Sequence, residues 1–335
     1  MLGSCVSHSA DADGLISAFF IRERERLRGN EAKVVFANYG NYLDKITEAQ
    51  GKFLYVSDLG VDPENEGAFK RALLGKLSEG FEVTYIDHHP DSEILLQDLK
   101  KEGVTVVHSL NDCAAVLAYN VFSSDLPKSY SLFAAYAAIG DHAEKGDIAS
   151  KIMTNTDTIL AYFEASVLSM AVGEDDDIKY GLLDFMRTSP LIHLYPNVLD
   201  RALHQLQKIQ SFLNQKIQVI SGKNHKWAAA EVDFFTGRAA SIMIQTMEID
   251  VAIAYKLDVG EYQISLRRSN NSEVDLGLIA NEAARAAMGS GGGHKQASGA
   301  RVPLRYLDKF LEEVSNKLRS TAVTRFCPPI FVTLT

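Results

Sequence analysis

Short apolar runs alternate with helix-like segments over the first 150 positions of the chain. The runs are rich in β-branched and aromatic residues, which is typical of buried strands. They occupy residues 2–7, 32–38, 52–57, 81–86 and 104–109. Between them, segments such as 15–29 and 65–80 carry apolar residues at helical spacing. Strands that alternate with helices predict βαβ units and a parallel sheet.

The second half of the chain has a different pattern. Residues 128–215 are mostly helix-like, and 199–217 form a long amphipathic segment that suits a connector between domains. Strand-like runs then follow at 216–221, 227–235, 251–258 and 261–269, and helix-like runs at 274–288 and 305–320. This order predicts a second, smaller α/β unit.

We therefore predict an α/β protein in which an N-terminal parallel-sheet domain is joined by a helical linker to a smaller α/β domain. The predicted boundaries are 1–190 for the first domain, 191–217 for the linker, 218–322 for the second domain and 323–335 for a C-terminal tail. Within that tail, the apolar run Ile330, Phe331 and Val332 leaves pairing with a partner chain or with the second domain open.

Composition narrows the class of protein. Hydrophobic residues make up 46% of the 335 positions and the net charge is −9. Proteins that coat long nucleic acids normally need a basic face, so an acidic chain favours short or small substrates. Cys5, Cys113 and Cys327 show no metal-type spacing, which indicates a reducing compartment. No apolar run approaches a membrane span and no secretory leader is visible, so we expect a cytoplasmic protein without a membrane partner.

Carboxylates and histidines lie directly after several of these predicted elements. They are His8, Asp11, Asp13, Asp58, Asp87, His88, His89 and Asp141. Ligands of a parallel sheet gather beyond the carboxyl ends of its strands, so we expect these side chains to meet at one edge. Their mixture of oxygen and imidazole donors suits Mn²⁺, Co²⁺ or Zn²⁺ better than Ca²⁺. The pattern predicts a site for two divalent ions, with Asp58 able to bridge them.

Simpler interpretations compete with the metal site. Asp58 or Asp141 alone would most simply be a helix N-cap. The stretch beginning at Asp11 is not an EF-hand loop, because Leu15 and Arg22 stand at the fifth and twelfth positions, where that loop needs acidic ligands. Two adjacent histidines after a buried strand have no obvious packing role. In addition, four separate segments all place potential metal ligands at the same predicted edge of the sheet. The metal interpretation is therefore favoured.

A glycine-rich stretch at 288–301 is the second candidate region. Its glycines would let backbone amides approach a phosphate closely, although a flexible tight turn explains the stretch equally well when it is taken alone. Upstream, two adjacent arginines end a predicted strand, and arginine forks match phosphate oxygens. The predicted substrate-binding residues are Arg267, Arg268, Gly291, Gly292, Gly293 and His294.

Taken together, these motifs resemble the DHH phosphoesterase superfamily in the arrangement that carries a DHHA1 domain, over roughly residues 1–322. The namesake triplet stands here as Asp87–His88–His89, and the DHHA1 glycine signature as 291–300. The sequence departs from the small oligoribonucleases in one spacing, because three positions rather than four separate His8 from Asp11. The resemblance implies two Mn²⁺ ions, with Mg²⁺ or Co²⁺ as alternatives.

The resemblance also implies roles for individual residues. One ion would be held by His8, Asp11 and Asp58, and the other by Asp13, Asp58, His88 and Asp141. Asp87 would support a ligand from behind, and His89 would face the scissile phosphate. Arg267 and His294 would contact a substrate phosphate from the DHHA1 domain.

The implied activity is a Mn²⁺-dependent phosphodiesterase that trims short single-stranded RNA or DNA oligonucleotides to mononucleotides. Relatives leave other activities open: hydrolysis of cyclic dinucleotides or of 3′-phosphoadenosine 5′-phosphate, and RecJ-type exonuclease action on single-stranded DNA. An inorganic pyrophosphatase or polyphosphatase is a further alternative, but relatives with those activities would share only the metal-binding half and carry a different C-terminal domain. An inactive replication scaffold is disfavoured because every ligand position is filled. A homodimer or a replication or repair partner also stays open.

Overall fold

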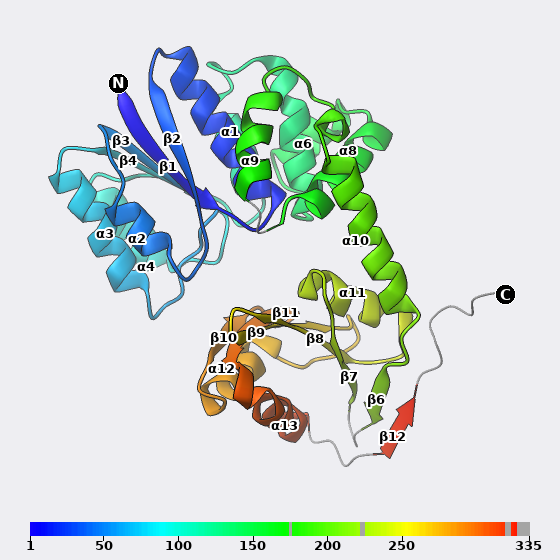
Figure 1. Ribbon diagram of the computed structural model, residues 1–335. Helices are drawn as coiled ribbons and strands as arrows, with labels where there is room; N and C mark the ends of the chain where they lie inside the picture. Colours follow the sequence, from blue (N-terminus) through cyan, green and yellow to red (C-terminus); the bar gives the residue numbers. More distant parts are fainter. Residues whose placement is uncertain (174–175, 222–224, 319–322, 327–335) are drawn as a thin grey trace. The chain divides into compact units, whose positions relative to one another are not determined.

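The structure is a computed structural model that describes residues 1–173, 176–221, 225–318 and 323–326 (Figure 1). The chain divides into two compact units, Met1–Ala202 and Leu203–Thr335, each built on its own sheet. The predicted α/β class is confirmed. The apolar run Ile330, Phe331 and Val332, and also Cys327, lie outside the described residues. Within the described part of the chain, no helix combines the length and apolarity needed to span a membrane.

Unit 1 contains a five-stranded sheet in which every pairing is parallel, in the order β2-β1-β3-β4-β5. Its strands are β1 (Leu2–His8), β2 (Glu31–Ala37), β3 (Phe53–Ser57), β4 (Glu82–Asp87) and β5 (Thr105–His108). The strand order reverses between β1 and β3. Such a switch point leaves a crevice at the carboxyl ends of the two strands, because the helices that follow them cover opposite faces.

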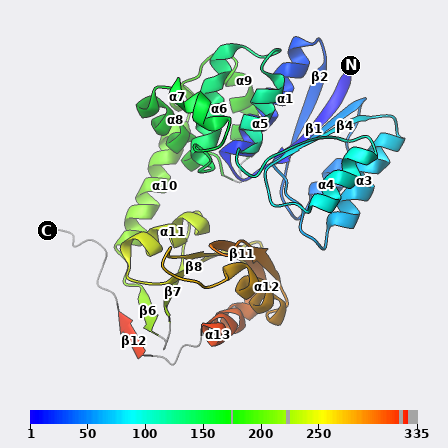
Figure 2. The ribbon, with the colours of Figure 1, turned by 180° about the vertical axis from the view of Figure 1, so that it is seen from behind.

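Two apolar cores lie on the two faces of this sheet. One is formed with α1 (Ala12–Leu27), α5 (Ala114–Phe122), α6 (Ser131–Gly140) and α8 (Thr158–Ala171). The other is formed with α2 (Tyr42–Thr47), α3 (Glu66–Ser78) and α4 (Glu93–Lys101), which lie across the sheet from α1 and α5 (Figure 2). The remaining helices of this unit are η1 (Lys128–Tyr130), α7 (Ala149–Thr154), α9 (Asp176–Phe185) and η2 (Ile192–Leu194). Helix α10 (Val198–Leu213) contains the boundary between the units.

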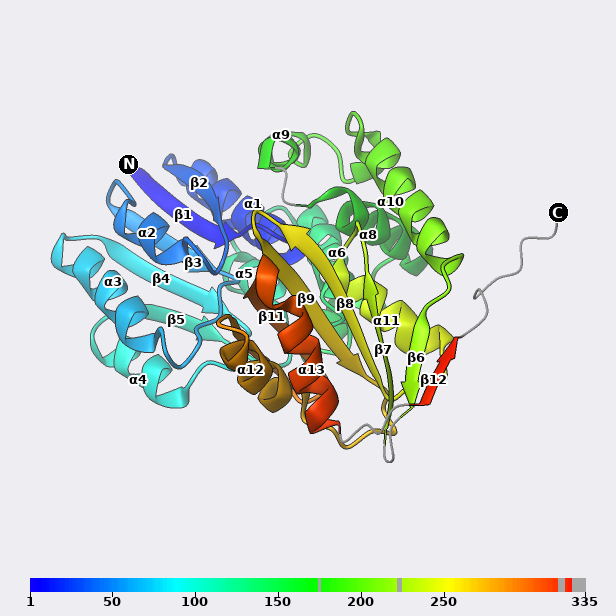
Figure 3. The same cartoon turned by 60° about the horizontal axis from the view of Figure 1, so that its bottom comes forward.

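Unit 2 contains a seven-stranded mixed sheet in the order β10-β11-β9-β8-β7-β6-β12, in which only β7 and β8 pair in parallel. Its strands are β6 (Gln218–Ser221), β7 (Lys226–Glu231), β8 (Val251–Asp258), β9 (Glu261–Arg268), β10 (Ser290–Gly293), β11 (Ala297–Pro303) and β12 (Val323–Phe326). Helices α12 (Leu276–Ala286) and α13 (Leu307–Lys317) pack on one face of the sheet, next to β9 and β11 (Figure 3). The short helix η3 (Leu304–Tyr306) precedes α13. Helix α11 (Thr236–Thr246) packs with the other face.

The glycine-rich stretch at 288–301 contains strand β10 and most of strand β11, which are antiparallel and joined by a turn at 294–296. Gly291, Gly292 and Gly293 belong to β10, which pairs with β11 at the edge of the sheet. A side chain at Gly291 would lie 2.8 Å from the carbonyl oxygen of Ala280 in α12, so this glycine allows the helix to pack directly on the strand. Packing therefore explains why glycine stands at this position, and the contact of Gly291 with a phosphate stays a prediction.

Candidate metal centre

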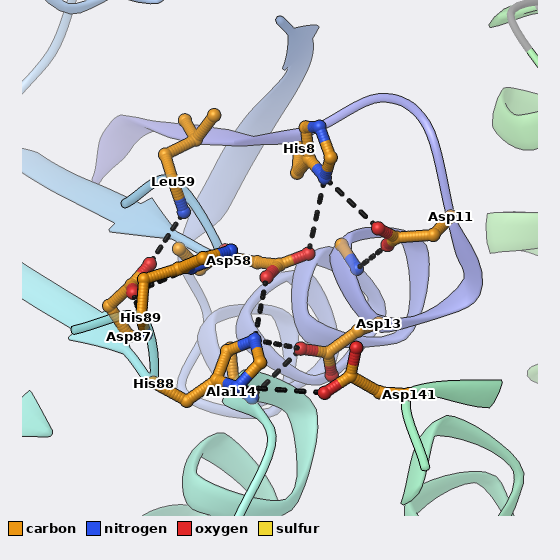
Figure 4. A network of polar contacts seen from close by, with 12 residues as sticks. His8, Asp11, Asp13, Asp58, Leu59, Asp87, His88, His89, Ala114 and Asp141 are labelled. Carbon is orange, nitrogen blue, oxygen red and sulfur yellow. Dashed lines mark hydrogen bonds and ion pairs between the residues drawn. The ribbon is translucent and has the colours of Figure 1, made fainter. Parts of the chain in front are cut away.

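The predicted ligands of unit 1 meet at the carboxyl edge of the parallel sheet. His8 ends β1 and Asp58 follows β3 directly, so the two residues flank the switch point of the strand order. Figure 4 shows Asp58 between His8 on one side and His88 on the other, with Asp141 approaching from the end of α6. Four segments of the chain that are distant in sequence therefore supply one cluster.

The cluster has two halves that share Asp58. In the first half, His8 Nδ1 lies 3.1 Å from Asp11 Oδ2 and 3.6 Å from Asp58 Oδ2. The three-position spacing between His8 and Asp11, one shorter than in the small oligoribonucleases, therefore still brings the two side chains together. In the second half, His88 Nε2 lies 3.4 Å from Asp58 Oδ1.

Two further carboxylates complete this second half. His88 Nε2 is 3.8 Å from Asp13 Oδ2, and His88 Nδ1 is 3.5 Å from Asp141 Oδ2. The two oxygens of Asp58 therefore face different groups of potential ligands, as a bridging carboxylate would. The structure brings together His8, Asp11, Asp13, Asp58, His88 and Asp141, while their role as ligands stays a prediction.

Local structure fixes several of these carboxylates. Asp11 is the N-cap of α1 and accepts a hydrogen bond from the backbone N–H of Gly14, so the simple capping role and the metal role coincide in one side chain. Asp13 accepts from the backbone N–H groups of Ala114 and Ala115 at 2.8 Å each. These amides open α5, whose N-terminus favours negative charge.

Asp58 has the strongest marks of a functional residue. Its backbone lies in the left-handed region with φ of 55°, which residues other than glycine rarely adopt. Only 2% of the residue is exposed, and its Oδ2 atom accepts no hydrogen bond within the described part of the chain. Burial, together with the nearby charges of Asp11 and Asp13, raises the pKa of Asp58 well above its usual range.

Two of the other carboxylates, Asp13 and Asp141, also have raised pKa values, whereas the charge and hydrogen bond of His8 outweigh burial and lower the pKa of Asp11. Burial is the largest cause that raises the pKa of Asp141, to about 8, and the charge of Asp13 adds to it. The pKa of Asp13 is also raised, chiefly by burial. Four crowded carboxylates with an unsatisfied buried oxygen make a set of donors that a divalent cation would neutralise and satisfy. The residues present therefore fit the predicted metal pair.

Asp87 supports the cluster from behind. It is fully buried, and its Oδ2 atom accepts a hydrogen bond of 2.6 Å from the backbone N–H of Leu59, which adjoins Asp58. Its Oδ1 atom accepts from His89 Nδ1 at 2.9 Å. Although burial opposes ionisation, the hydrogen bond and charge of His89 lower the pKa of Asp87. A side chain at Gly60 would lie 2.5 Å from the His89 ring, so this glycine makes room for it.

Several supporting residues are absent from the sequence motifs. His108 Nε2 donates to the carbonyl oxygen of His89 at 2.7 Å. Asp91 accepts from the Tyr85 hydroxyl and, at 2.8 Å, from the backbone N–H of Val61. Both contacts brace the loops after β3 and β4. No local sequence pattern marks these residues, because each contacts a segment that is remote in the sequence.

Asp112 braces a third ligand-bearing segment. This buried carboxylate accepts hydrogen bonds from the backbone N–H groups of Ile148 and Ala149 at 2.8 to 3.1 Å. Those two residues end the loop that begins at Asp141. Asp112 also stands two positions before Ala114, whose amide holds Asp13. One short segment thus ties down the chain around two of the predicted ligands.

In unit 2 the two predicted arginines lie apart. Consecutive strand residues point to opposite faces, so Arg267 and Arg268 of β9 do not share a face. Arg267 reaches α11, where its Nη2 atom would be 3.0 Å from a side chain at Gly237. Arg268 Nε donates to the carbonyl oxygen of Lys295 at 3.1 Å. Of these two arginines, Arg267 is therefore the one placed at the α11 face, and the contact of either arginine with a substrate phosphate stays a prediction.

Unpaired positive charge gathers at the start of α11. Burial lowers the pKa of Arg267 and of Arg238, and neither forms an ion pair with a carboxylate among the described residues. No sequence pattern selects Arg238, because a single arginine in a helix is usually a solvated surface residue. His294 is exposed and lies in the turn between β10 and β11, where its backbone N–H donates to Ala297.

Comparisons with known proteins bear on both units. Residues 204–320 match the sequence profile of the DHHA1 domain. No curated protein matches the sequence. The fold is similar to that of a solved DHH domain from a protein described as a member of the s1p family of ribosomal proteins. The two chains are 16% identical, with a TM-score of 0.67 over 96% of this chain and 87% of that one.

Two further solved structures share the fold. One is RecJ from Thermus thermophilus in complex with Mn²⁺, with 15% identity and a TM-score of 0.58 over 94% of this chain and 52% of that one. The chain therefore spans about half of RecJ. The other is a pGpG-specific phosphodiesterase from Vibrio cholerae, with 12% identity and a TM-score of 0.54 over 94% of this chain and 98% of that one.

Proposed function

We propose that this chain is a divalent-metal-dependent phosphodiesterase that hydrolyses short single-stranded oligonucleotides to mononucleotides. Its match to the DHHA1 domain and the similarity of its fold to a DHH domain support the proposal. One observation carries the proposal. Asp58, which is buried and incompletely satisfied, directs its two oxygens to two groups of carboxylates and imidazoles. Such a bridged pair of ligand groups suits the in-line displacement of a phosphate ester.

The ligand groups divide the residues between two ions. His8, Asp11 and Asp58 would hold one ion, and the other would be held by Asp13, Asp58, His88 and Asp141. When bound, the pair supplies Lewis-acid polarisation of the phosphate and a water molecule whose pKa is lowered. Mixed carboxylate and imidazole donors favour Mn²⁺, and Mg²⁺ and Co²⁺ are alternatives to be compared directly.

Residues beside the ligands would bind and orient the substrate. His89 would face the scissile phosphate and stabilise its negative charge electrostatically, with its Nδ1 atom held by Asp87. Burial lowers the pKa of His89, but the hydrogen bond and charge of Asp87 outweigh it and raise the pKa to about 9. In unit 2, we propose that Arg267 contacts a substrate phosphate, with His294 and Gly292 as further candidates.

A preference for short substrates follows from the net charge of −9. Tight binding of long strands draws on many phosphate contacts to basic residues and depends strongly on salt. An acidic chain has fewer such contacts to offer. The DHHA1 match over residues 204–320 also disfavours an inorganic pyrophosphatase, since the relatives expected to have that activity carry a different second domain.

The proposal is tested with end-labelled dinucleotides, 5-mers and 24-mers, together with a cyclic dinucleotide, 3′-phosphoadenosine 5′-phosphate and pyrophosphate. Each is incubated with the full chain in Mn²⁺, Mg²⁺, Co²⁺ or EDTA, at low and high salt. We expect metal-dependent release of mononucleotides, fastest from the short oligonucleotides. Faster cleavage of the 24-mer would point to a RecJ-type exonuclease instead, and turnover of pyrophosphate alone would contradict the proposal.

Matched histidine variants separate the metal centre from general effects of mutation. His88→Ala removes a predicted ligand and should abolish hydrolysis. His204→Ala removes an exposed histidine of α10 and should leave it unchanged. Equal activity of the two variants would refute the assignment of the site.

A further inference from the structure

Tyr39 brings a fifth segment of the chain to the metal centre. It follows β2 after one intervening residue, so it stands at the same carboxyl edge of the sheet as the predicted ligands. The rule that selected residues after β1, β3 and β4 would have selected it too. Its phenol hydroxyl lies 3.3 Å from His89 Nε2 and forms a hydrogen bond with it.

The two nitrogens of the His89 ring are therefore held from opposite sides. Asp87 Oδ1 accepts from Nδ1 at 2.9 Å, and the Tyr39 hydroxyl binds Nε2. A hydroxyl can donate to a neutral ring nitrogen or accept from a protonated one, so the contact survives either state of the imidazole. The backbone of His89 is fixed as well, because its N–H donates to Asp87 at 2.7 Å and its carbonyl oxygen accepts from His108.

Tyr39 is itself well anchored although it is half exposed. Asn38 and Asn41 close the turn around it, since the Asn38 side chain accepts from the Gly40 N–H at 2.9 Å and the Asn41 side chain accepts from the Asn38 N–H at 3.0 Å. The phenol ring also packs against His8, with ring centroids 5.4 Å apart. A group held this firmly can restrain a neighbour.

Burial does not explain the placement of this side chain. Tyr39 leaves 47% of its surface exposed, whereas the neighbouring Tyr42 is almost fully buried in the core. An exposed phenol contributes little apolar stabilisation, so its contacts with two histidines of the site need another reason. Fixing the orientation of a group before the substrate arrives lowers the barrier of the reaction that follows.

We propose that Tyr39 is a positioning residue for His89, holding the imidazole in the plane from which it contacts the substrate phosphate. This inference rests on the proposed function, because it assigns His89 a task in phosphodiester hydrolysis. It makes Tyr39 part of the reaction machinery without direct contact to the predicted metal ions.

The test is a double-mutant cycle on dinucleotide hydrolysis in Mn²⁺. Tyr39→Phe keeps the ring against His8 and removes only the hydroxyl. We expect kcat to fall about tenfold, in the range of one lost hydrogen bond to an ionisable group, with KM changed by less than about twofold. In a His89→Ala background the same substitution should have no further effect, because the group that Tyr39 positions is gone.

A remote tyrosine supplies the control. The Tyr119 hydroxyl donates to the carbonyl oxygen of Lys128 at 3.3 Å, so Tyr119→Phe removes a hydrogen bond of the same length that involves no predicted site residue. This variant should keep the kcat of the native protein. An unchanged kcat in Tyr39→Phe, or an equal fall of kcat in both backgrounds of the cycle, would overturn the proposal.

A second measurement does not depend on activity. Nitrogen NMR of labelled histidine reports the environment of the His89 ring in the metal-free protein. We expect Tyr39→Phe to shift the Nε2 resonance of His89, and Tyr119→Phe to leave it in place. Native protein that fails to hydrolyse any nucleotide would refute the proposed function, whereas an unshifted Nε2 resonance would refute the Tyr39 contact alone.

Discussion

The carboxyl edge of the unit 1 sheet and the glycine strand β10 of unit 2 differ in what holds their motif residues. At the first, charged side chains are buried and face one another around Asp58. At the second, Gly291 packs on α12. Parallel strands deliver the residues that follow them to one edge, so a motif there indicates a site directly. Residues within a strand of a mixed sheet diverge to two faces, so neighbours in sequence such as Arg267 and Arg268 separate.

The largest expected effect concerns Asp58. Asp58→Asn keeps the size of the side chain and tolerates the left-handed backbone, but it removes the bridging charge. We expect kcat to fall by roughly 10³-fold, because a metal pair supplies several kcal/mol of transition-state stabilisation. The metal-free variant should be at least as stable as the native protein, since one buried like charge is lost.

The control for this variant is Asp98→Asn, which changes an aspartate on the surface of α4 that pairs with Lys70. Steady-state kinetics and thermal unfolding in EDTA give the two readouts. Retention of full activity by Asp58→Asn would contradict the claim that the carboxyl edge of the unit 1 sheet is the catalytic site and that it differs from β10 in this respect.

The two arginines of β9 sharpen the comparison within unit 2. We expect Arg267→Ala to raise KM about tenfold or more, because a charge-assisted contact to phosphate is lost. Arg268→Ala should change KM by no more than about twofold, since its side chain bonds to Lys295 on the other face of the strand. Equal effects of the two substitutions on KM would show that the face of the strand does not decide the role.

Two glycines of β10 separate packing from binding. A side chain at Gly291 would lie 2.8 Å from Ala280 and 3.0 Å from Ala284, whereas Gly292 has nothing within 4 Å. Gly291→Ala should destabilise the protein by about 1–3 kcal/mol through overpacking, and Gly292→Ala by less than about 0.5 kcal/mol. Urea unfolding measures both. A raised KM in Gly292→Ala alone would show that the open glycine faces the substrate.

The smallest expected effect is a pH dependence confined to unit 1. The folded-state pKa of Asp141 is raised to about 8, so between about pH 4 and 8 the metal-free folded protein binds more protons than the unfolded chain, and stability falls as pH rises. The pKa of His89 is raised to about 9, so its contribution is lost between about pH 6.5 and 9. Asp87 has a lowered pKa, so its contribution to stability is lost only as the pH falls below about 4.

We therefore expect the Tm of the metal-free protein to fall from about pH 6.5 to 8, and Mn²⁺ to raise Tm more at about pH 8, where fewer protons compete for the ligands. Differential scanning fluorimetry in EDTA and in Mn²⁺ provides the comparison, and Asp141→Asn should make the fall of Tm with pH less steep, leaving the part due to His89. A metal-free Tm that rises over this interval would contradict the assigned direction of the pKa shifts.

The sequence predicted the fold class and the residues now clustered in unit 1, because each of them lies at or shortly after the end of a strand or helix whose apolar pattern is strong. It did not predict the amides of Ala114 and Ala115 on Asp13, or the bracing by Asp112, since these contacts join segments that lie far apart in the sequence. Helices α2 and α11 were missed because their apolar stretches are short.

Metal stoichiometry tests the central claim most directly. Native protein and Asp58→Asn are titrated with Mn²⁺ and followed by electron paramagnetic resonance. The account predicts two Mn²⁺ ions per native chain with a spin-coupled spectrum, and loss of that coupling when Asp58 no longer bridges them. A single ion in the native chain, or two uncoupled ions that the substitution leaves undisturbed, would contradict it.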